Sequence, residues 1–160
     1  PNIALYAKLK LSNNYSRLGK LDKSIEISRT LTESNPEHYH VWFHLASFLA
    51  ASKEYFQAAE AFKKTTTLKP EEGLSHVGLA FSYFGDQKPG LAIKELKKGM
   101  TIFKANKNIS WYRDCRFAIN QIKGFARFPK SFSDLWLRKN LKRVHDTYLD
   151  AVLDLNNLLN

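Results

Sequence analysis

Apolar residues recur along this chain with the spacing of amphipathic helices. Between positions 39 and 52, four of them follow the i, i+3, i+4, i+7 order that places side chains on one helix face: Trp42, Leu45, Ala46 and Leu49. A second face follows after a short turn at Lys53–Tyr55, and it is formed by Ala58, Phe62 and Thr65. Pro70 then ends the pattern. Residues 39–72 therefore predict two helices joined by a tight turn.

The same arrangement returns along the chain with a fixed period. Pro36 and Pro70 are 34 residues apart, and a shift of 34 residues superposes Leu11 on Leu45 and Leu45 on Leu79. A period of this length is typical of helical repeat arrays, in which each unit buries its apolar face against its neighbours. We therefore predict an all-α solenoid of stacked helix pairs.

These positions resemble the tetratricopeptide repeat (TPR) family, whose unit carries a large residue early in its first helix, small residues in its second helix and a closing proline. The middle unit fits this pattern best, through Trp42, Leu45, Ala46, Ala58, Phe62 and Pro70. Lys8 and His76 depart from it, because they stand where the large aromatic residue is usual. The resemblance covers about residues 5–106, and it implies a right-handed α-solenoid of TPR helix pairs with C-terminal capping helices.

The predicted superhelix spans residues 1–127, and a long C-terminal helix within 128–160 follows it. The superhelix divides into units at about 5–38, 39–72 and 73–106 and a degenerate helix at 108–126. Apolar residues open the first unit, where a terminal repeat needs a polar surface, and the chain does not start with Met. We therefore expect the chain to be a fragment of a larger protein.

The C-terminal helix carries an apolar stripe with alternating spacings of four and three: Leu137, Leu141, Val144, Tyr148, Ala151, Leu155 and Leu158. Two interpretations follow. The helix packs inside the chain as a cap on the last repeat, over the apolar face of the Trp111–Phe125 helix, or it mediates self-association. The stripe is wider than a coiled-coil seam, which favours the intramolecular cap.

The net charge of +10 arises in one segment. Residues 104–143 hold 11 of the 25 Lys and Arg residues but only 2 of the 15 acidic residues. The candidate basic patch consists of Arg113, Arg116, Lys123, Arg127, Arg138, Lys139, Lys142 and Arg143. Such a patch suits nucleic-acid phosphates, an anionic surface or an acidic protein, whereas solvated helix faces give similar counts without any ligand.

The sequence offers little catalytic chemistry. It contains no Gly-rich phosphate loop, no Gly-x-Ser-x-Gly, no Cys-x-x-Cys and no His-Glu-x-x-His, so we predict neither enzyme activity nor a cofactor. His40 and His44 form an i, i+4 pair with His76 on the next repeat, but a zinc site needs three or four ligands at recognisable spacing. We therefore predict no metal.

Two features bear on location. The lone Cys115 excludes an intrachain disulfide and suits a reducing compartment. No apolar run reaches the roughly 18 residues of a membrane span, so we predict no transmembrane segment and a cytoplasmic location.

The resemblance places ligand binding on the concave face, which the first helices of the units line. The positions it implies for a partner-binding groove are Tyr6, Leu9, Asn13, His40, Phe43, Ser47, Leu74, Val77, Phe81 and Phe84. Leu9, His44 and Leu74 replace the Lys and Asn residues with which some family members grip acidic chaperone tails, so we exclude that ligand.

The sequence thus predicts a non-catalytic protein–protein interaction module, a scaffold or adaptor that holds a peptide or helix of a partner in its groove. Two alternatives stay open. One is a basic nucleic-acid-binding adaptor, and the other is the recognition arm of a larger enzyme.

Overall fold

The computed structural model describes residues 3–125 and 127–159, with side chains as far as Val152. Every regular element of this part of the chain is an α-helix. In chain order the helices are α1 (Ile3–Arg17), α2 (Leu21–Ser34), α3 (Tyr39–Ala51), α4 (Tyr55–Leu68), α5 (Gly73–Gly85), α6 (Pro89–Ala105), α7 (Ile109–Phe125) and α8 (Lys130–Leu159).

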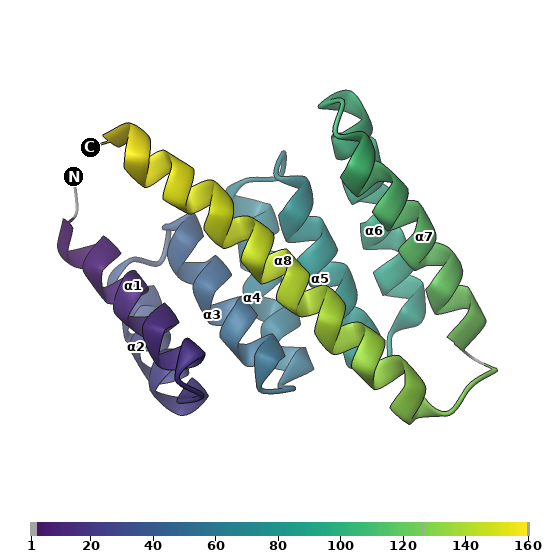
Figure 1. Ribbon diagram of the computed structural model, residues 1–160, viewed down its shortest axis with the longest axis horizontal. Coiled ribbons are helices and arrows are strands. Elements are labelled where there is room, and N and C mark those ends of the chain that lie inside the picture. The colour runs from purple at the N-terminus through teal and green to yellow at the C-terminus, as the bar shows by residue number, and fades with distance from the viewer. Residues whose placement is uncertain (1–2, 126, 160) are drawn as a thin grey trace.

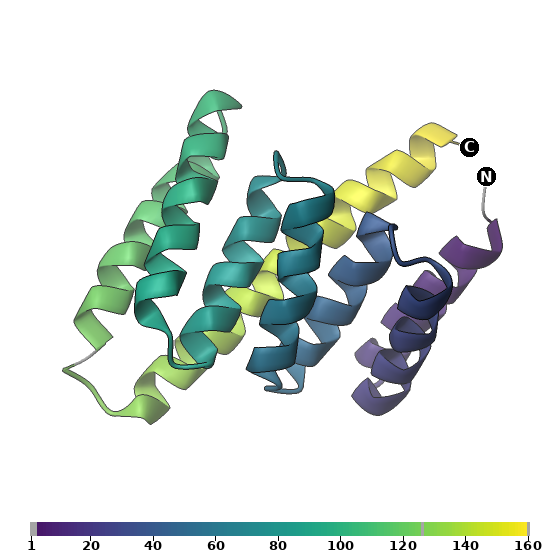
Figure 2. The ribbon, with the colours of Figure 1, turned by 180° about the vertical axis from the view of Figure 1, so that it is seen from behind.

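The first seven helices form a layered array, and the eighth crosses it. The pairs α1/α2, α3/α4 and α5/α6 lie side by side, α7 continues the row, and α8 runs diagonally over one face (Figure 1). From behind, the second helices of the pairs lie in front and α8 passes on the far side (Figure 2). The first helices therefore form the face that α8 covers (Figure 1), and this is the side that the resemblance implies as the concave face. The all-α solenoid is confirmed.

The backbone turns repeat with the same period as the apolar residues. Gly19, Lys53 and Gln87 all have positive φ, at 77°, 63° and 60°. Each follows the first helix of a pair by the same number of residues, and a backbone hydrogen bond closes each turn, for example from the Glu54 N–H to the Leu49 carbonyl at 2.9 Å. A left-handed residue at this place ends a helix and satisfies its last carbonyl groups. The turn chemistry therefore reinforces the 34-residue repeat.

Small residues allow the helices to approach closely. Ala46 of α3 and Ala58 of α4 are completely buried. A Cβ atom built on Gly78 of α5 would lie 2.5 Å from the Phe62 ring of α4, closer than real Cβ contacts. Any larger residue at Gly78 would push α5 away from α4, because a packed interior has no room for the added carbon.

The core divides into two clusters. The larger one extends through α3 to α8, whereas a smaller one, formed by Leu5, Leu9, Leu31 and Val41, holds the first pair against α3. Ser24 contributes a polar link inside the first pair, because its hydroxyl donates to the Ser12 carbonyl at 2.7 Å. None of the helices in the described part of the chain is long and apolar enough to cross a membrane.

The concave face as candidate interaction site

Helix α8 covers the concave face with its apolar stripe. Four residues of that stripe are buried: Leu137, Leu141, Val144 and Tyr148. Most contacts of α8 are with α5 and α3. The sequence predicts this helix over α7 and the last repeat. In the structure it lies across α5 of the third unit and α3 of the second, and it also contacts α7 at Phe125 and Asp114. The side chains of Leu155 and Leu158 lie outside the described residues.

The N-terminal half of α8 is held by an aromatic cage. The Trp136 ring lies edge-on to Phe81 and Phe84 of α5, with ring centroids 5.5 and 5.6 Å apart, and to Phe125 of α7 at 4.8 Å. Edge-to-face pairs at these distances add to the stabilisation that comes from burying the rings. The cage therefore binds α8 to two helices at once.

The C-terminal half of α8 rests on α3 through a different chemistry. The Tyr148 ring stacks on Phe43 at 4.0 Å, with 14° between the ring planes. Its hydroxyl shares a hydrogen bond of 2.7 Å with Nδ1 of His40. His44 and His145 lie beside this pair, with ring centroids 6.2 Å apart. The contact between α3 and the C-terminal half of α8 therefore has polar groups at its centre, from Tyr148 and the three histidines.

Burial keeps these histidines neutral. It lowers the pKa of His40 to about 4, together with the smaller effect of nearby Lys69. Burial also lowers the pKa of His145 to about 4, and it lowers that of His44 well below the ordinary value of 6.5. Nδ1 of His44 and Nε2 of His145 have no hydrogen-bond partner among the described residues. Protonating His44 would therefore place a charge in a buried site, whereas Asp146 would offset part of the charge at His145.

A charged contact joins α8 to the start of α7. The Arg143 guanidinium pairs with the Asp114 carboxylate at 2.5 Å, and it lies over the Trp111 ring with its carbon 4.3 Å from the ring centroid. An arginine that stacks and pairs at once is held in one orientation, because its planar fork matches both partners. This contact therefore gives α8 a second connection to α7, in addition to Trp136 and Phe125.

One part of the concave face stays open. A cavity of about 640 Å³ lies between α8 and the C-terminal ends of α1 and α3, and its walls include Asn13, Arg17, Ser47 and His145. The Ser47 hydroxyl is buried and has no hydrogen-bond partner among the described residues. The cavity shows that α8 fits closely on α3 and α5 but stands away from α1.

The predicted groove residues fall into four groups. His40, Phe43, Phe81 and Phe84 contact α8. Asn13 and Ser47 line the open cavity, and Tyr6 and Leu74 are partly buried at the edges of the two core clusters.

Leu9 and Val77 face the interior of the array. Leu9 packs in the small cluster with Leu31 and Val41. Val77 lies against α6, within 3.4 Å of a Cβ built on Gly99. Their role in a partner-binding groove stays a prediction, as it does for the other members of the set.

The predicted basic residues are all exposed, and they lie on α7, on α8 and at Arg127 between them. Arg143 is paired with Asp114, and Lys142 pairs with Asp146 at 2.7 Å on the same helix. Exposed pairs of this kind contribute little stability. A common ligand for these residues stays a prediction.

The remaining titratable groups have structural partners. Nδ1 of His76 lies 2.9 Å from the Glu95 carboxylate, and its Nε2 lies 2.9 Å from the Pro70 carbonyl oxygen. Burial alone would lower the pKa of His76, but these two partners outweigh it and raise the pKa. Burial raises the pKa of Cys115 to about 12, so its sulfur stays a thiol. Across the described residues, no group of three or more His, Cys, Asp or Glu side chains could hold a metal ion.

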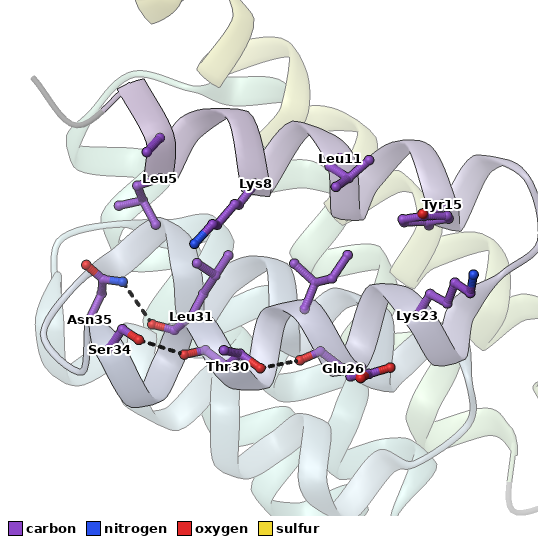
Figure 3. Close-up of a pocket in the computed structure, with 12 residues that line it drawn as sticks. Leu5, Lys8, Leu11, Tyr15, Lys23, Glu26, Thr30, Leu31, Ser34 and Asn35 are labelled. Atoms are coloured by element: carbon purple, nitrogen blue, oxygen red, sulfur yellow. Dashed lines mark hydrogen bonds between the residues drawn. The ribbon is translucent and has the colours of Figure 1, made fainter.

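A second cavity lies at the N-terminal end of the array. It measures about 520 Å³, and side chains of α1 and α2 face each other across it (Figure 3). Leu11 in its wall is 47% exposed, whereas Leu45 and Leu79, its counterparts in the next two units, are 3% and 2% exposed. The next two units bury this position, and only the first leaves it open.

Sequence reasoning missed the residues of α8 that fill the concave face. Trp136, His145 and Tyr148 belong to a helix that the sequence predicts correctly. Which helices these three residues contact is not predicted. One signal was present. Without α8, the three phenylalanines of the predicted groove would form an unusually large exposed apolar surface. A surface of this kind usually packs against another segment of the chain or against a partner.

The fold and the concave face together define a class, an all-helical repeat protein of the kind that serves as a protein-interaction scaffold. Residues 5–38 match the family model described as Tetratricopeptide repeat. Residues 5–38 therefore carry a tetratricopeptide repeat, as the 34-residue register predicts for the first unit.

Solved structures share this fold. MamA of AMB-1 is 26% identical with a TM-score of 0.59, and the match covers 63% of this chain and 60% of that one. The Yersinia enterocolitica type III secretion translocator chaperone SycD has a TM-score of 0.71 at 12% identity, and the match covers 80% of this chain and 89% of that one. The likeness to SycD is one of fold alone. The chain spans about 60% of the length of the MamA structure it matches, and it has no significant match among curated protein sequences.

Proposed function

We propose that the concave face binds a helical segment of a partner protein and that this segment takes the place of α8. The observation that carries the proposal is α8 itself, a helix seated on α3 and α5 through buried apolar side chains. A face that holds one amphipathic helix has the width and the apolar character to hold another, as in other helix-in-groove complexes. The chain acts in this proposal as a non-catalytic scaffold.

Helix α8 is then an internal competitor. It follows α7 after a short connection, from Phe125 to Lys130. A segment tethered so closely has an effective concentration of about millimolar. A partner helix therefore binds with an affinity reduced by the fraction of molecules whose face is free. Weakening α8 should raise the affinity for the partner.

A binding experiment tests this exchange. A fluorescent peptide of residues 130–152 is titrated into the full chain and into its Trp136→Ala variant, with anisotropy as the readout. We expect the variant to bind the peptide at least tenfold more tightly, because its own α8 has lost the aromatic cage. Leu135→Ala, at an exposed neighbour, is the matched control and should bind as the parent chain does.

Two results would contradict the exchange. One is equal affinity of the peptide for both chains. The other is unchanged affinity after Phe43→Ala is added to the Trp136→Ala chain, because Phe43 stacks on Tyr148 of the docked helix. Circular dichroism of each variant separates lost binding from lost folding.

The alternative of a nucleic-acid adaptor has one observation in its favour. Three phenylalanines near the basic residues are exposed: Phe117, Phe128 and Phe132. Aromatic rings among basic side chains can stack the bases of a single strand. Binding of an unstructured RNA that falls with salt and is lost in Phe117→Ala would support this alternative, and no binding at low salt would remove it.

A further inference from the structure

Three side chains of α8 meet three separate receptors on the array. Trp136 enters the cage of Phe81, Phe84 and Phe125. Arg143, seven residues later, reaches Asp114. The third contact is made by Tyr148, described next.

Tyr148 lies twelve residues after Trp136, about 18 Å along a helix. It stacks on Phe43 and bonds His40. Its receptor lies on α3, whereas the Trp136 cage is built from α5 and α7. All three contacts can therefore form only if the bound helix has this spacing between its three side chains and runs in this direction.

The apolar residues between these contacts share their face. Leu137, Leu141 and Val144 are buried, at positions 1, 5 and 8 after Trp136. Exposed neighbours such as Lys139 point away from the array. The buried set fixes the rotation of the helix, because one inserted residue would turn everything after it by about 100°.

We propose that the partner helix carries this same pattern, which deepens and rests on the proposed helix exchange. Its elements are a tryptophan, an arginine seven residues later and a tyrosine twelve residues later, with apolar residues at positions 1, 5 and 8. The helix runs from α7 toward α1, as α8 does. Helix α8 is thus an internal copy of the ligand, and its sequence describes the segment to look for in a partner.

Each anchor has a reason for its residue type. The cage is formed by ring faces and edges, which favour a large aromatic ring over an aliphatic side chain. Asp114 beside the Trp111 ring favours the planar guanidinium of arginine over the ammonium of lysine. The partly buried His40 ring favours a tyrosine, because a phenylalanine would leave Nδ1 without this hydrogen bond.

Peptide variants test the pattern on the full chain. The receptor is the Trp136→Ala chain, and a Tyr148→Ala chain is the second receptor in case the first folds poorly. The reference peptide covers residues 130–152 with the natural sequence. Competing peptides carry an alanine inserted after residue 142, the reversed order of the same residues, or Arg143→Lys. A peptide with Lys139→Ala, an exposed position, is the matched control.

We expect the insertion and the reversed peptide to bind at least tenfold more weakly than the reference, the Arg143→Lys peptide several-fold more weakly, and the control equally well. If the reference binds but the inserted and reversed peptides match it, the face accepts any apolar helix, and the pattern is wrong while the exchange stands. If the reference binds neither receptor although both are folded, the exchange itself fails and the pattern fails with it.

Discussion

The two halves of α8 are held on the same face by opposite kinds of chemistry. Around Trp136 the contact consists of the aromatic rings of Phe81, Phe84 and Phe125. Around Tyr148 the contact holds three neutral histidines, one of which bonds the tyrosine hydroxyl. Apolar packing does not depend on pH, whereas a buried neutral histidine does.

The comparison teaches that α8 need not leave the face as one piece. Conditions that charge histidines should free its C-terminal half, while the aromatic cage keeps its N-terminal half in place. The part of the face on α3 would then become available before the part on α5.

Acidification should produce the largest effect, and only at the histidine half. The docked pKa of His40 and of His145 is about 4, below the ordinary 6.5, so the docked state binds fewer protons than the free state. The stabilisation is complete above about pH 6.5 and is lost as the pH falls from 6.5 toward 4. At pH 5 the two shifts together should weaken the docking by about 4 kcal/mol.

Charged and titratable neighbours also affect the pKa values of these histidines, and most of them act in the same direction as burial. His40 faces Lys69 and His38, and His44 faces His145 and His40, all of which oppose protonation. His145 faces Arg17 and Lys142, which also oppose it, and Asp146, which favours it. Amide hydrogen exchange of α8 between pH 7 and 5, corrected for intrinsic rates, measures the release. Equal protection of both halves at pH 5 would refute the division.

Trp136→Ala should have the second largest effect, at the other half. Removing the ring empties the cage and should cost about 3 kcal/mol of stability, because truncating a packed aromatic side chain leaves a cavity. Urea unfolding measures the loss. The Leu135→Ala control, at a half-exposed position, should change stability by less than about 0.5 kcal/mol. A loss no larger than that of the control would mean that the cage does not hold α8.

Tyr148→Phe should have the smallest effect. The stacked ring stays on Phe43, and only the hydrogen bond to His40 is lost, at a cost of about 1 kcal/mol. The pH dependence should persist in the variant, because burial and not this bond lowers the pKa of His40. Urea midpoints at pH 7 and pH 5.5 give both quantities. A variant that matches the parent at both pH values would exclude a role for this bond.

Much of the fold could be predicted because its signals are local. A 34-residue period in apolar and small residues defines helix pairs without knowledge of distant contacts, and Leu45 and Ala46 are buried where the period places them. The C-terminal helix follows from its stripe in the same way: the sequence predicts it at about 132–158, and α8 runs over Lys130–Leu159.

The seat of α8 could not be predicted in this way. An apolar stripe shows that one face of a helix is buried against another part of the protein. It does not show which of several apolar faces is the partner. Here both α7 and the concave face present apolar side chains on which α8 could pack. The contacts of Trp136 and Tyr148 show that most of α8 packs on the concave face. The same limit applies to Leu9 and Val77, which share their helix side with groove residues yet pack on neighbouring helices.

The diagonal course of α8 also changes how the array unfolds. In a simple repeat array each unit contacts only its neighbours, so stability is a sum of local terms and the ends can unfold separately. Helix α8 joins α3, α5 and α7 directly, and the bond between His40 and Tyr148 spans 108 residues of chain. Such long-range contacts slow folding, because the chain must close a large loop before they form. They also join the helices from α3 through α8 into one cooperative unit. The first pair, α1 and α2, is then the part that can unfold separately.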